Sequence, residues 1–210
     1  MTINISLGSS GSFSQYSLSS AAPAFTSTTD VSSFTSDQIK ALTVNQVASL
    51  TTTQVTAIAT DALAGLTNKQ LQALTTRNVA VLSTAQVAAL SSTQLNALSN
   101  TQINNLTTAQ VNALTSDQLP GFRATGVAAL STSRMVSVTT TQIATLSTKQ
   151  IQALTTDQMV SLIDSQIAAM GSDQIASLKA NQLRAIETRD ISGLTTGQVV
   201  TLGKIGRAHV

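Results

Sequence analysis

Few residues of this 210-residue chain carry side chains suited to acid–base, nucleophilic or metal chemistry. There is no Cys and a single His, His209, which excludes disulfides, thiolate metal sites and any His-based triad or metal cluster. Nine acidic residues remain, and two of them could act as general acid and base if a pocket brought them together. The spacing of these acids therefore decides the interpretation.

The acidic residues follow a repeat of eight residues. Five of the nine occupy the same place in that repeat: Asp37, Asp61, Asp117, Asp157 and Asp173. If this place is the first turn of a helix, the helix dipole favours a negative charge there, and no catalytic role is needed. The densest charge cluster is interpreted as a solvated face and comprises Glu187, Arg189 and Asp190. No glycine-rich phosphate-binding motif occurs. We predict no catalytic residue, no cofactor-binding residue and no metal ligand, and a protein that is not an enzyme.

The repeat itself is the strongest signal in the sequence. From Phe34 to Thr201 the chain divides into 21 octads without insertion or deletion. Positions 1 and 6 are apolar in every octad, position 2 is Ser or Thr in 15, position 5 is Gln in 16, and position 8 is small in all but two. A fixed tandem period indicates a repeat architecture. We therefore expect residues 34–201 to form an octapeptide-repeat solenoid of 21 repeats, irregular at 120–126, where Pro120 and Gly126 interrupt the pattern.

A short capped helix fits the octad better than the other elements. Eight residues advance a helix by about 800°, so the apolar positions would spiral around one long helix. A flat strand would place positions 1 and 6 on opposite faces. In a capping box, position 2 is the N-cap and position 5 reaches back to it, while positions 1 and 6 form a hydrophobic staple. Thr107 and Gln110 would then form the box, and Leu106 would pack on Val111.

Such helices need neighbours. A helix of about five to seven residues is unstable alone in water, so the octads must stack. We expect positions 1, 6 and 8 to form a continuous narrow core. The prediction is an all-α solenoid, or superhelix, of very short capped helices, one per 8-residue repeat; a β-solenoid with one bend per octad is the alternative.

The two ends of the chain lie outside the repeat. Residues 1–33 are rich in Ser, and we expect a flexible leader or N-terminal cap. Residues 202–210 are expected to be a truncated end: residues 205–210, IGRAHV, can be back-translated to the start of a common sequencing adapter, and more of the same array would then follow. Without Lys204 and Arg207, 11 − 2 = 9 basic residues balance 9 acidic ones, so the pI near 9.3 does not indicate a basic protein.

Composition argues against nucleic-acid and membrane partners. Lys69, Arg77 and Lys149 share position 4 with a larger number of acids, so no basic stripe for phosphates forms. Aromatic residues, on which bases would stack, make up only 2% of the chain. No apolar run approaches about 18 residues, so no transmembrane helix is expected. The N-terminus lacks the basic and apolar blocks of a signal peptide, which is compatible with cytoplasmic residence and with export through a C-terminal signal.

The segments LSTAQVAALSSTQLNAL and LTTDQMVSL carry a resemblance. They resemble the L-[TS]-[TS]-x-Q-[VI]-x-A arrays of large bacterial secreted or surface proteins, which are described as adhesin-like or haemolysin-type. The resemblance covers residues 34–201 and implies an extracellular or cell-surface location. It favours a non-catalytic stalk, spacer or scaffold without cofactors. A repetitive binding module for a glycan or protein partner, using positions 3, 4 and 7, is the alternative, and an ice-binding β-solenoid is a remote one.

Overall fold

Short α-helices, nearly one per octad, make up the described chain. The computed structural model describes residues 25–187 and 194–208, in two compact units, Met1–Leu98 and Ser99–Val210. Unit 1 contains α1 (Ser36–Ala41), α2 (Val44–Ala48), α3 (Thr52–Ala57), α4 (Thr60–Leu63), α5 (Asn68–Ala73), α6 (Thr76–Ala80), α7 (Thr84–Ala89) and α8 (Ser92–Ala97). Unit 2 contains α9 (Asn100–Asn104), α10 (Thr108–Asn112), the 3-10 helix η1 (Leu119–Gly121), α11 (Ala124–Ala128), α12 (Thr132–Ser137), α13 (Thr140–Thr145), α14 (Thr148–Ala153), α15 (Thr156–Ser161), α16 (Asp164–Ala168), α17 (Ser172–Ala176), α18 (Ala180–Glu187) and α19 (Thr196–Ala208).

This element list confirms the predicted all-α solenoid. No strand occurs anywhere in residues 25–187 and 194–208, so the β-solenoid alternative was wrong, and the ice-binding variant with it. The physical reason lies in the position-2 hydroxyls, which are used to start helices and are therefore not arrayed on a flat sheet.

The helices begin where the capping box predicts. In α10, Thr107 Oγ1 accepts from the backbone N–H of Gln110 at 3.1 Å, and Gln110 Oε1 accepts from the backbone N–H of Thr107 at 2.7 Å. The same reciprocal pair opens α1, α2, α3, α5, α7, α8, α9, α13, α14 and α15. The pair satisfies two of the free N–H groups at a helix start. The predicted capping boxes are confirmed.

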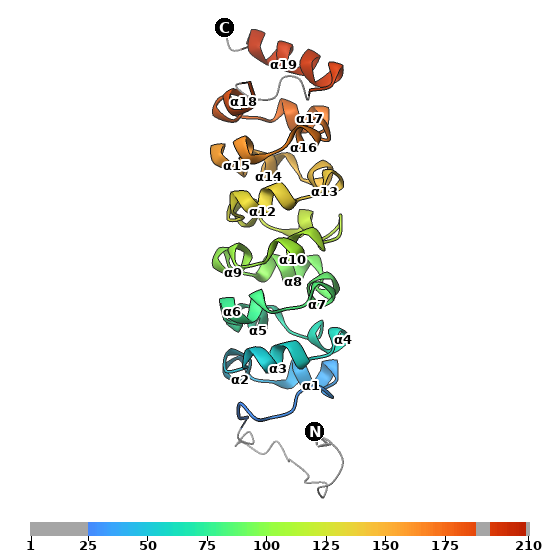
Figure 1. The fold of residues 1–210 in the computed structure, drawn as a ribbon, viewed down its shortest axis with the longest axis vertical. Coiled ribbons are helices and arrows are strands. Elements are labelled where there is room, and N and C mark those ends of the chain that lie inside the picture. The colour runs from blue at the N-terminus through green and yellow to red at the C-terminus, as the bar shows by residue number, and fades with distance from the viewer. Residues whose placement is uncertain (1–24, 188–193, 209–210) are drawn as a thin grey trace, which may run out of the picture. The chain divides into compact units, whose positions relative to one another are not determined.

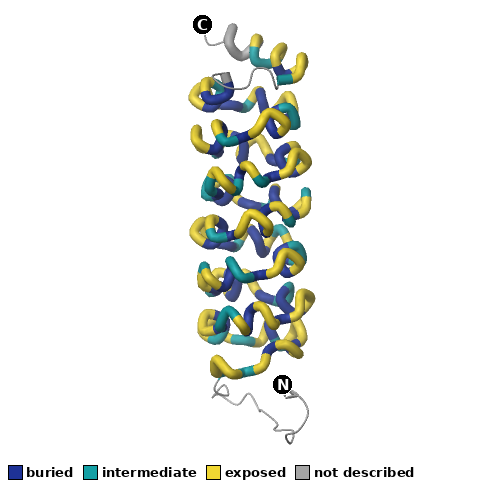
Figure 2. Tube along the Cα trace, in the orientation of Figure 1, coloured by how far each residue is buried: buried dark blue, intermediate teal, exposed yellow. Residues whose placement is uncertain are grey.

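The core consists of positions 1, 5 and 6. Leu106 and Val111 are 1% and 0% exposed, as a hydrophobic staple requires, and Gln110 is also only 1% exposed. Position 8 was expected in the core, but residues such as Ala97 and Ala113 are only half-buried. Position 8 lies at the helix end, next to solvent, whereas the position-5 amide has hydrogen-bond partners in the interior, such as the carbonyls bonded to Gln86. Figure 2 shows the buried segments on the inner side of the helices of each unit.

At one place position 8 brings two helices close together. A Cβ atom added to Gly65 would lie 2.5 Å from the backbone oxygen of Ser36 and 2.9 Å from its Cα atom. Real Cβ atoms do not approach backbone this closely, so α1 and α4 would have to separate. Glycine at this position therefore allows the close backbone approach.

Within each unit, helices pack against helices three octads away. Within unit 1, α1 contacts α4, α4 contacts α7, α2 contacts α5 and α5 contacts α8. Within unit 2, α12 contacts α15 and α15 contacts α18. Figure 1 shows α1, α4 and α7 one above another at the right of unit 1, and α12, α15 and α18 at the left of unit 2. In each unit, helices in contact are therefore three octads apart along the chain.

A turn of 3-10 helix replaces the α-helix at the expected irregularity. Pro120 has no N–H to donate, and the chain instead closes tighter turns, from Gly121 N–H to Gln118 O at 3.0 Å and from Phe122 N–H to Leu119 O at 3.1 Å. Leu119 and Phe122 are still 0% and 3% exposed. The octad therefore keeps its register although it loses its α-helix.

Residues 25–33 precede the first octad and lie against it. Val31 is 1% exposed, and Gln54 Nε2 donates to the carbonyls of Thr26 and Thr29 at 2.9 and 3.0 Å. Residues 1–24 of the expected leader and residues 209–210 of the expected adapter translation lie outside the described residues. The boundaries at 1–33 and 202–210 remain predictions.

Candidate functional site

The position-5 glutamine uses both ends of its amide. Gln86 in α7 is 3% exposed. Its Oε1 accepts from the backbone N–H of Ser83 at 2.8 Å, which is the capping box of its own helix. Its Nε2 donates to the carbonyls of Val55 and Ile58 at 3.1 and 2.8 Å, at the end of α3. One side chain thus completes the start of one helix and the end of another.

This arrangement recurs along both units. The amide Nε2 donates to the carbonyl 28 residues earlier in Gln54, Gln70, Gln86, Gln94, Gln142, Gln150, Gln158, Gln166, Gln174, Gln182 and Gln198. In most of them it also reaches the carbonyl 31 residues earlier. Helices leave their last carbonyls without an internal partner, and these amides supply one. We call this series the glutamine ladder.

The octads without glutamine at position 5 show which of its two functions is kept, accepting at the N-cap or donating to an earlier helix. Asn78 Nδ2 still donates to Leu50 O at 2.9 Å, although α6 has no reciprocal capping box because the Asn side chain is shorter. Arg134 donates through Nε to Leu106 O, again 28 residues earlier. Ala62 and Gly126 have no side-chain donor. Where a polar residue other than Gln is described at position 5, it therefore keeps the long-range hydrogen bond.

Sequence reasoning assigned glutamine only to the capping box and missed the ladder. The missed signal was the amide itself, since a capping box accepts Glu as readily as Gln. Gln stands at position 5 in 16 octads and Glu in none. Unlike a carboxylate, an amide can accept at its own N-cap and also donate elsewhere. Throughout the described chain no buried side-chain nitrogen or oxygen lacks a hydrogen-bond partner, which avoids a penalty of about 1–3 kcal/mol for each group.

The acidic residues are distributed over separate helices. Four of the five position-4 acids lie in the first turn of a helix, as expected: Asp37, Asp61, Asp157 and Asp173. Asp117 lies in the octad that has no α-helix. Among the side chains that the structure describes, no three metal-binding residues come together. The Glu187, Arg189 and Asp190 cluster and His209 lie outside the described side chains.

One carboxyl has a local hydrogen-bond partner that shifts its titration. The backbone N–H of Ser32 donates to Asp30 Oδ1 at 2.9 Å, and the Ser32 hydroxyl donates to the same oxygen at 2.7 Å. Both bonds stabilise the ionised form, the backbone bond most, and they lower the pKa of Asp30 below its ordinary value of 3.8. The carboxyl organises the turn before the first octad.

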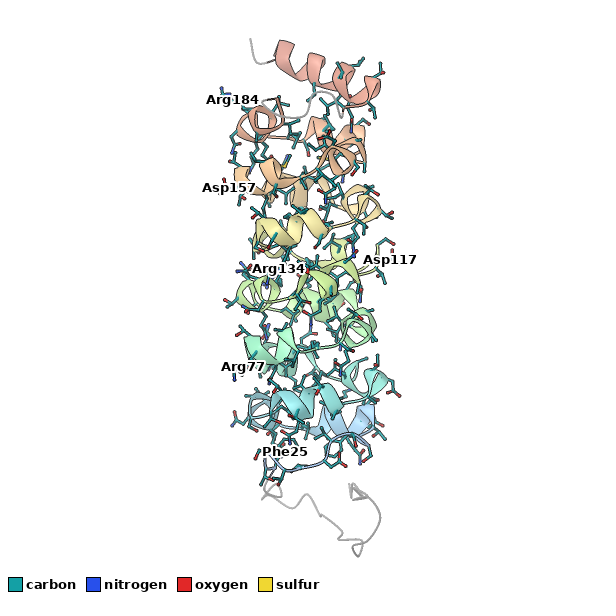
Figure 3. The ribbon with its side chains drawn as sticks, viewed as in Figure 1. Phe25, Arg77, Asp117, Arg134, Asp157 and Arg184 are labelled. Carbon is teal, nitrogen blue, oxygen red and sulfur yellow. The ribbon has the colours of Figure 1, made fainter. Side chains whose placement is uncertain are left out.

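The outer surface is formed mainly by positions 2, 3, 4 and 7. The basic residues Lys69, Arg77 and Lys149 are exposed, and Figure 3 shows Arg77, Asp157 and Arg184 at the outside of the helices. The surface also contains apolar side chains that the sequence did not single out. Val136, Val160 and Ile163 in unit 2 are 45%, 39% and 49% exposed, and the first two are at position 7 of contacting helices, α12 and α15.

Comparison with known proteins identifies the repeat. Within the described residues, no helix combines the length and the apolar character that a membrane crossing requires. A search of curated proteins found no match. A family model described as the ALTTAQ repeat matches residues 55–92, 63–100, 92–124, 127–164 and 167–204, which together cover most of the chain. The chain therefore belongs to the ALTTAQ repeat family.

Proposed function

We propose that this chain is a structural repeat region, a stalk, spacer or scaffold, of a bacterial secreted or surface protein. The observation that supports the proposal is that the side chains repeated from octad to octad form the core, the helix caps and the hydrogen bonds between layers. Positions 1 and 6 form the apolar core, position 2 caps the helices, and the position-5 amide joins one layer to an earlier one, as Gln86 does through Val55 and Ile58. The residue types that recur from octad to octad are therefore those that hold successive layers of the solenoid together.

The proposed role needs no catalytic group. The family that matches is defined by its repeat, and stacked repeats gain length by adding equivalent neighbour contacts. The side chains that vary along the array are the exposed ones. We therefore propose a protein that is not an enzyme, acts without a cofactor and does not bind nucleic acid.

The surface location is testable on intact cells of the producing bacterium. We expect an added protease to remove the array while a cytoplasmic marker protein stays intact, and antibody against the array to label unpermeabilised cells. Protection of the array from protease until the cells are lysed would contradict an extracellular or cell-surface location.

Three of the five exposed large apolar residues of unit 2 favour a second function, a binding module for a glycan or protein. Val136, Val160 and Ile163 stand out because the surrounding octads expose mainly Ser, Thr, Gln and Asn. The test compares wild type with the triple variant Val136→Thr, Val160→Thr and Ile163→Thr in glycan-array and pull-down assays. Val44→Thr, at a 43% exposed residue of unit 1, is the matched control.

The two functions predict different results. A spacer shows no specific ligand on the arrays, and the triple variant behaves like wild type when it replaces the chain in the producing cell. If a ligand binds wild type and the Val44 variant but not the triple variant, the result would contradict the spacer function and support the binding module.

A further inference from the structure

Three consecutive octads of unit 2 lack a complete capping box, and two of them also lack glutamine at position 5. The octad 114–121 forms the 3-10 helix η1 in place of an α-helix. The next helix, α11, has Arg123 at the N-cap and no side-chain capping bond. In α12 the N-cap Ser131 side chain also makes no capping bond to the helix backbone. The backbone N–H of Arg134 donates to the Ser131 carbonyl at 3.0 Å, and Arg134 Nη1 donates to the Ser131 hydroxyl at 2.8 Å. The interval 115–137 is therefore a continuous run without a complete capping box.

Gln118 in the first octad still accepts from the backbone N–H of Thr115 at 2.8 Å, but the position-5 residues of the other two octads give less to the ladder. Gly126 has no side chain and therefore no donor. Arg134 donates to Leu106 O but has no acceptor for the backbone N–H of Ser131. In the neighbouring regular octad, Gln142 reaches the carbonyls of Val111 and Leu114, and also accepts from its own N-cap at 2.8 Å.

The following octads are bound to this run normally. Gln150 Nε2 donates to Leu119 O at 3.1 Å and Phe122 O at 2.8 Å. Gln158 donates to Leu130 O at 2.6 Å. Core residues are also retained, since Val127 and Met135 are 1% and 0% exposed. The run is therefore folded and covered, but it contributes fewer bonds of its own than the octads on its C-terminal side.

We propose that residues 115–137 are a built-in breakpoint, the internal segment of the array that opens first while the regular octads after it stay folded. In a stacked repeat array, stability is a sum of local terms, so consecutive weak repeats open as a unit without unfolding the rest. The inference rests on the missing caps and donors and is independent of whether the array serves as a spacer or as a binding module.

Hydrogen exchange of the full chain tests the breakpoint. Each missing cap raises the local opening equilibrium by a factor of about 2–30. We therefore expect amides of 115–137 to exchange at least about tenfold faster than those of 139–161, where α13, α14 and α15 all have complete capping boxes. The repair variant combines Pro120→Asn, Arg123→Thr and Arg134→Gln, which restore the helical N–H, the N-cap hydroxyl and the capping-box amide. Its exchange should slow towards the rate of the regular octads, although Gly126 still provides no donor.

A second variant transfers the defect. Thr155→Arg with Gln158→Gly removes the cap and the amide from a regular octad, and we expect a new fast-exchanging segment at 155–161 while the remaining octads keep their rates. Equal exchange of 115–137 and 139–161 in wild type would overturn the proposal. An unchanged rate in the repair variant would also overturn it, because the missing caps would then not be the cause.

Discussion

The substitution Gln86→Glu separates the two roles of the ladder glutamine. Glutamate keeps the acceptor for the Ser83 N–H, so capping alone predicts little change or a small gain from the helix dipole. The carboxylate cannot donate to Val55 O and Ile58 O, which now receive Nε2 at 3.1 and 2.8 Å. Two lost bonds to buried carbonyls cost about 2–4 kcal/mol, and burial of the charge adds to that cost.

The effect has a defined pH dependence. Burial beside carbonyl oxygens raises the pKa of the new carboxyl in the folded state above its unfolded value of about 4.3. Between these two pKa values the folded chain binds more protons than the unfolded chain, so stability falls as pH rises. We therefore expect the stability deficit of the variant to be smallest below about pH 4 and full at pH 7.

Urea denaturation and hydrogen exchange of residues 52–58 measure the deficit, since local exchange reports the layer that loses its donor. Gln86→Met, which removes both ends of the amide, should be destabilised at pH 7 and insensitive to pH at this site. Gln46→Glu, at a half-buried position, should change stability much less. A Gln86→Glu chain as stable as wild type at pH 7 would refute the ladder as a source of stability.

Three further predictions follow from individual contacts. Gly65→Ala should lower the free energy of unfolding by about 1–3 kcal/mol, because the new Cβ meets the Ser36 backbone at 2.5 Å; thermal denaturation measures it. Asn78→Gln should stabilise the chain by about 0.5–1.5 kcal/mol, because the longer amide can keep the bond to Leu50 O and complete the capping box of α6; urea denaturation measures it. The Asp30 carboxyl should titrate below 3.8 by NMR, and the stability that it contributes is present at neutral pH and lost as pH falls through its lowered pKa.

Each of these predictions has a matched control. Gly197→Ala should not destabilise, since no atom lies within 4 Å of the added Cβ. Asn45→Gln, at an exposed position 4, should be neutral, and an equal gain there would remove the reason given for Asn78. Ser32→Ala should move the Asp30 midpoint partway towards its ordinary value, because only the side-chain bond is deleted. An unmoved midpoint would show that this bond does not shift the pKa.

The local structure of the octad was predictable from sequence because a capping box and a staple act within one repeat. Thr107, Gln110, Leu106 and Val111 occur in an order that only one short motif explains, and the structure places each where that motif requires. The same locality explains the disruption at Pro120, where a missing N–H acts on its own turn.

The contacts between layers were not predictable in the same way. Because the octads are nearly identical, their sequence does not indicate which repeats contact each other. The hydrogen bond from Gln86 to Ile58, 28 residues earlier, could therefore not be predicted from the spacing. The core was misjudged for a related reason. Small residues at position 8 indicated close packing, but buried glutamine is rare without partners, and the acceptors of Gln86 Nε2 come from outside its octad. The exposed Val136 and Val160 were also missed, because position 7 has no fixed residue type.

The glutamine ladder has a direction. Each long-range hydrogen bond of the glutamine ladder runs from a glutamine Nε2 to a backbone carbonyl that precedes it by 25 to 31 residues. A ribosome delivers the chain N-terminus first, so the acceptors of each octad have left the exit tunnel before its donor appears. Once a first layer has formed, the glutamine of each newly made octad can donate to carbonyls that have already been synthesised. The array can therefore fold in the order in which it is synthesised, because each layer supplies the hydrogen-bond acceptors for the next.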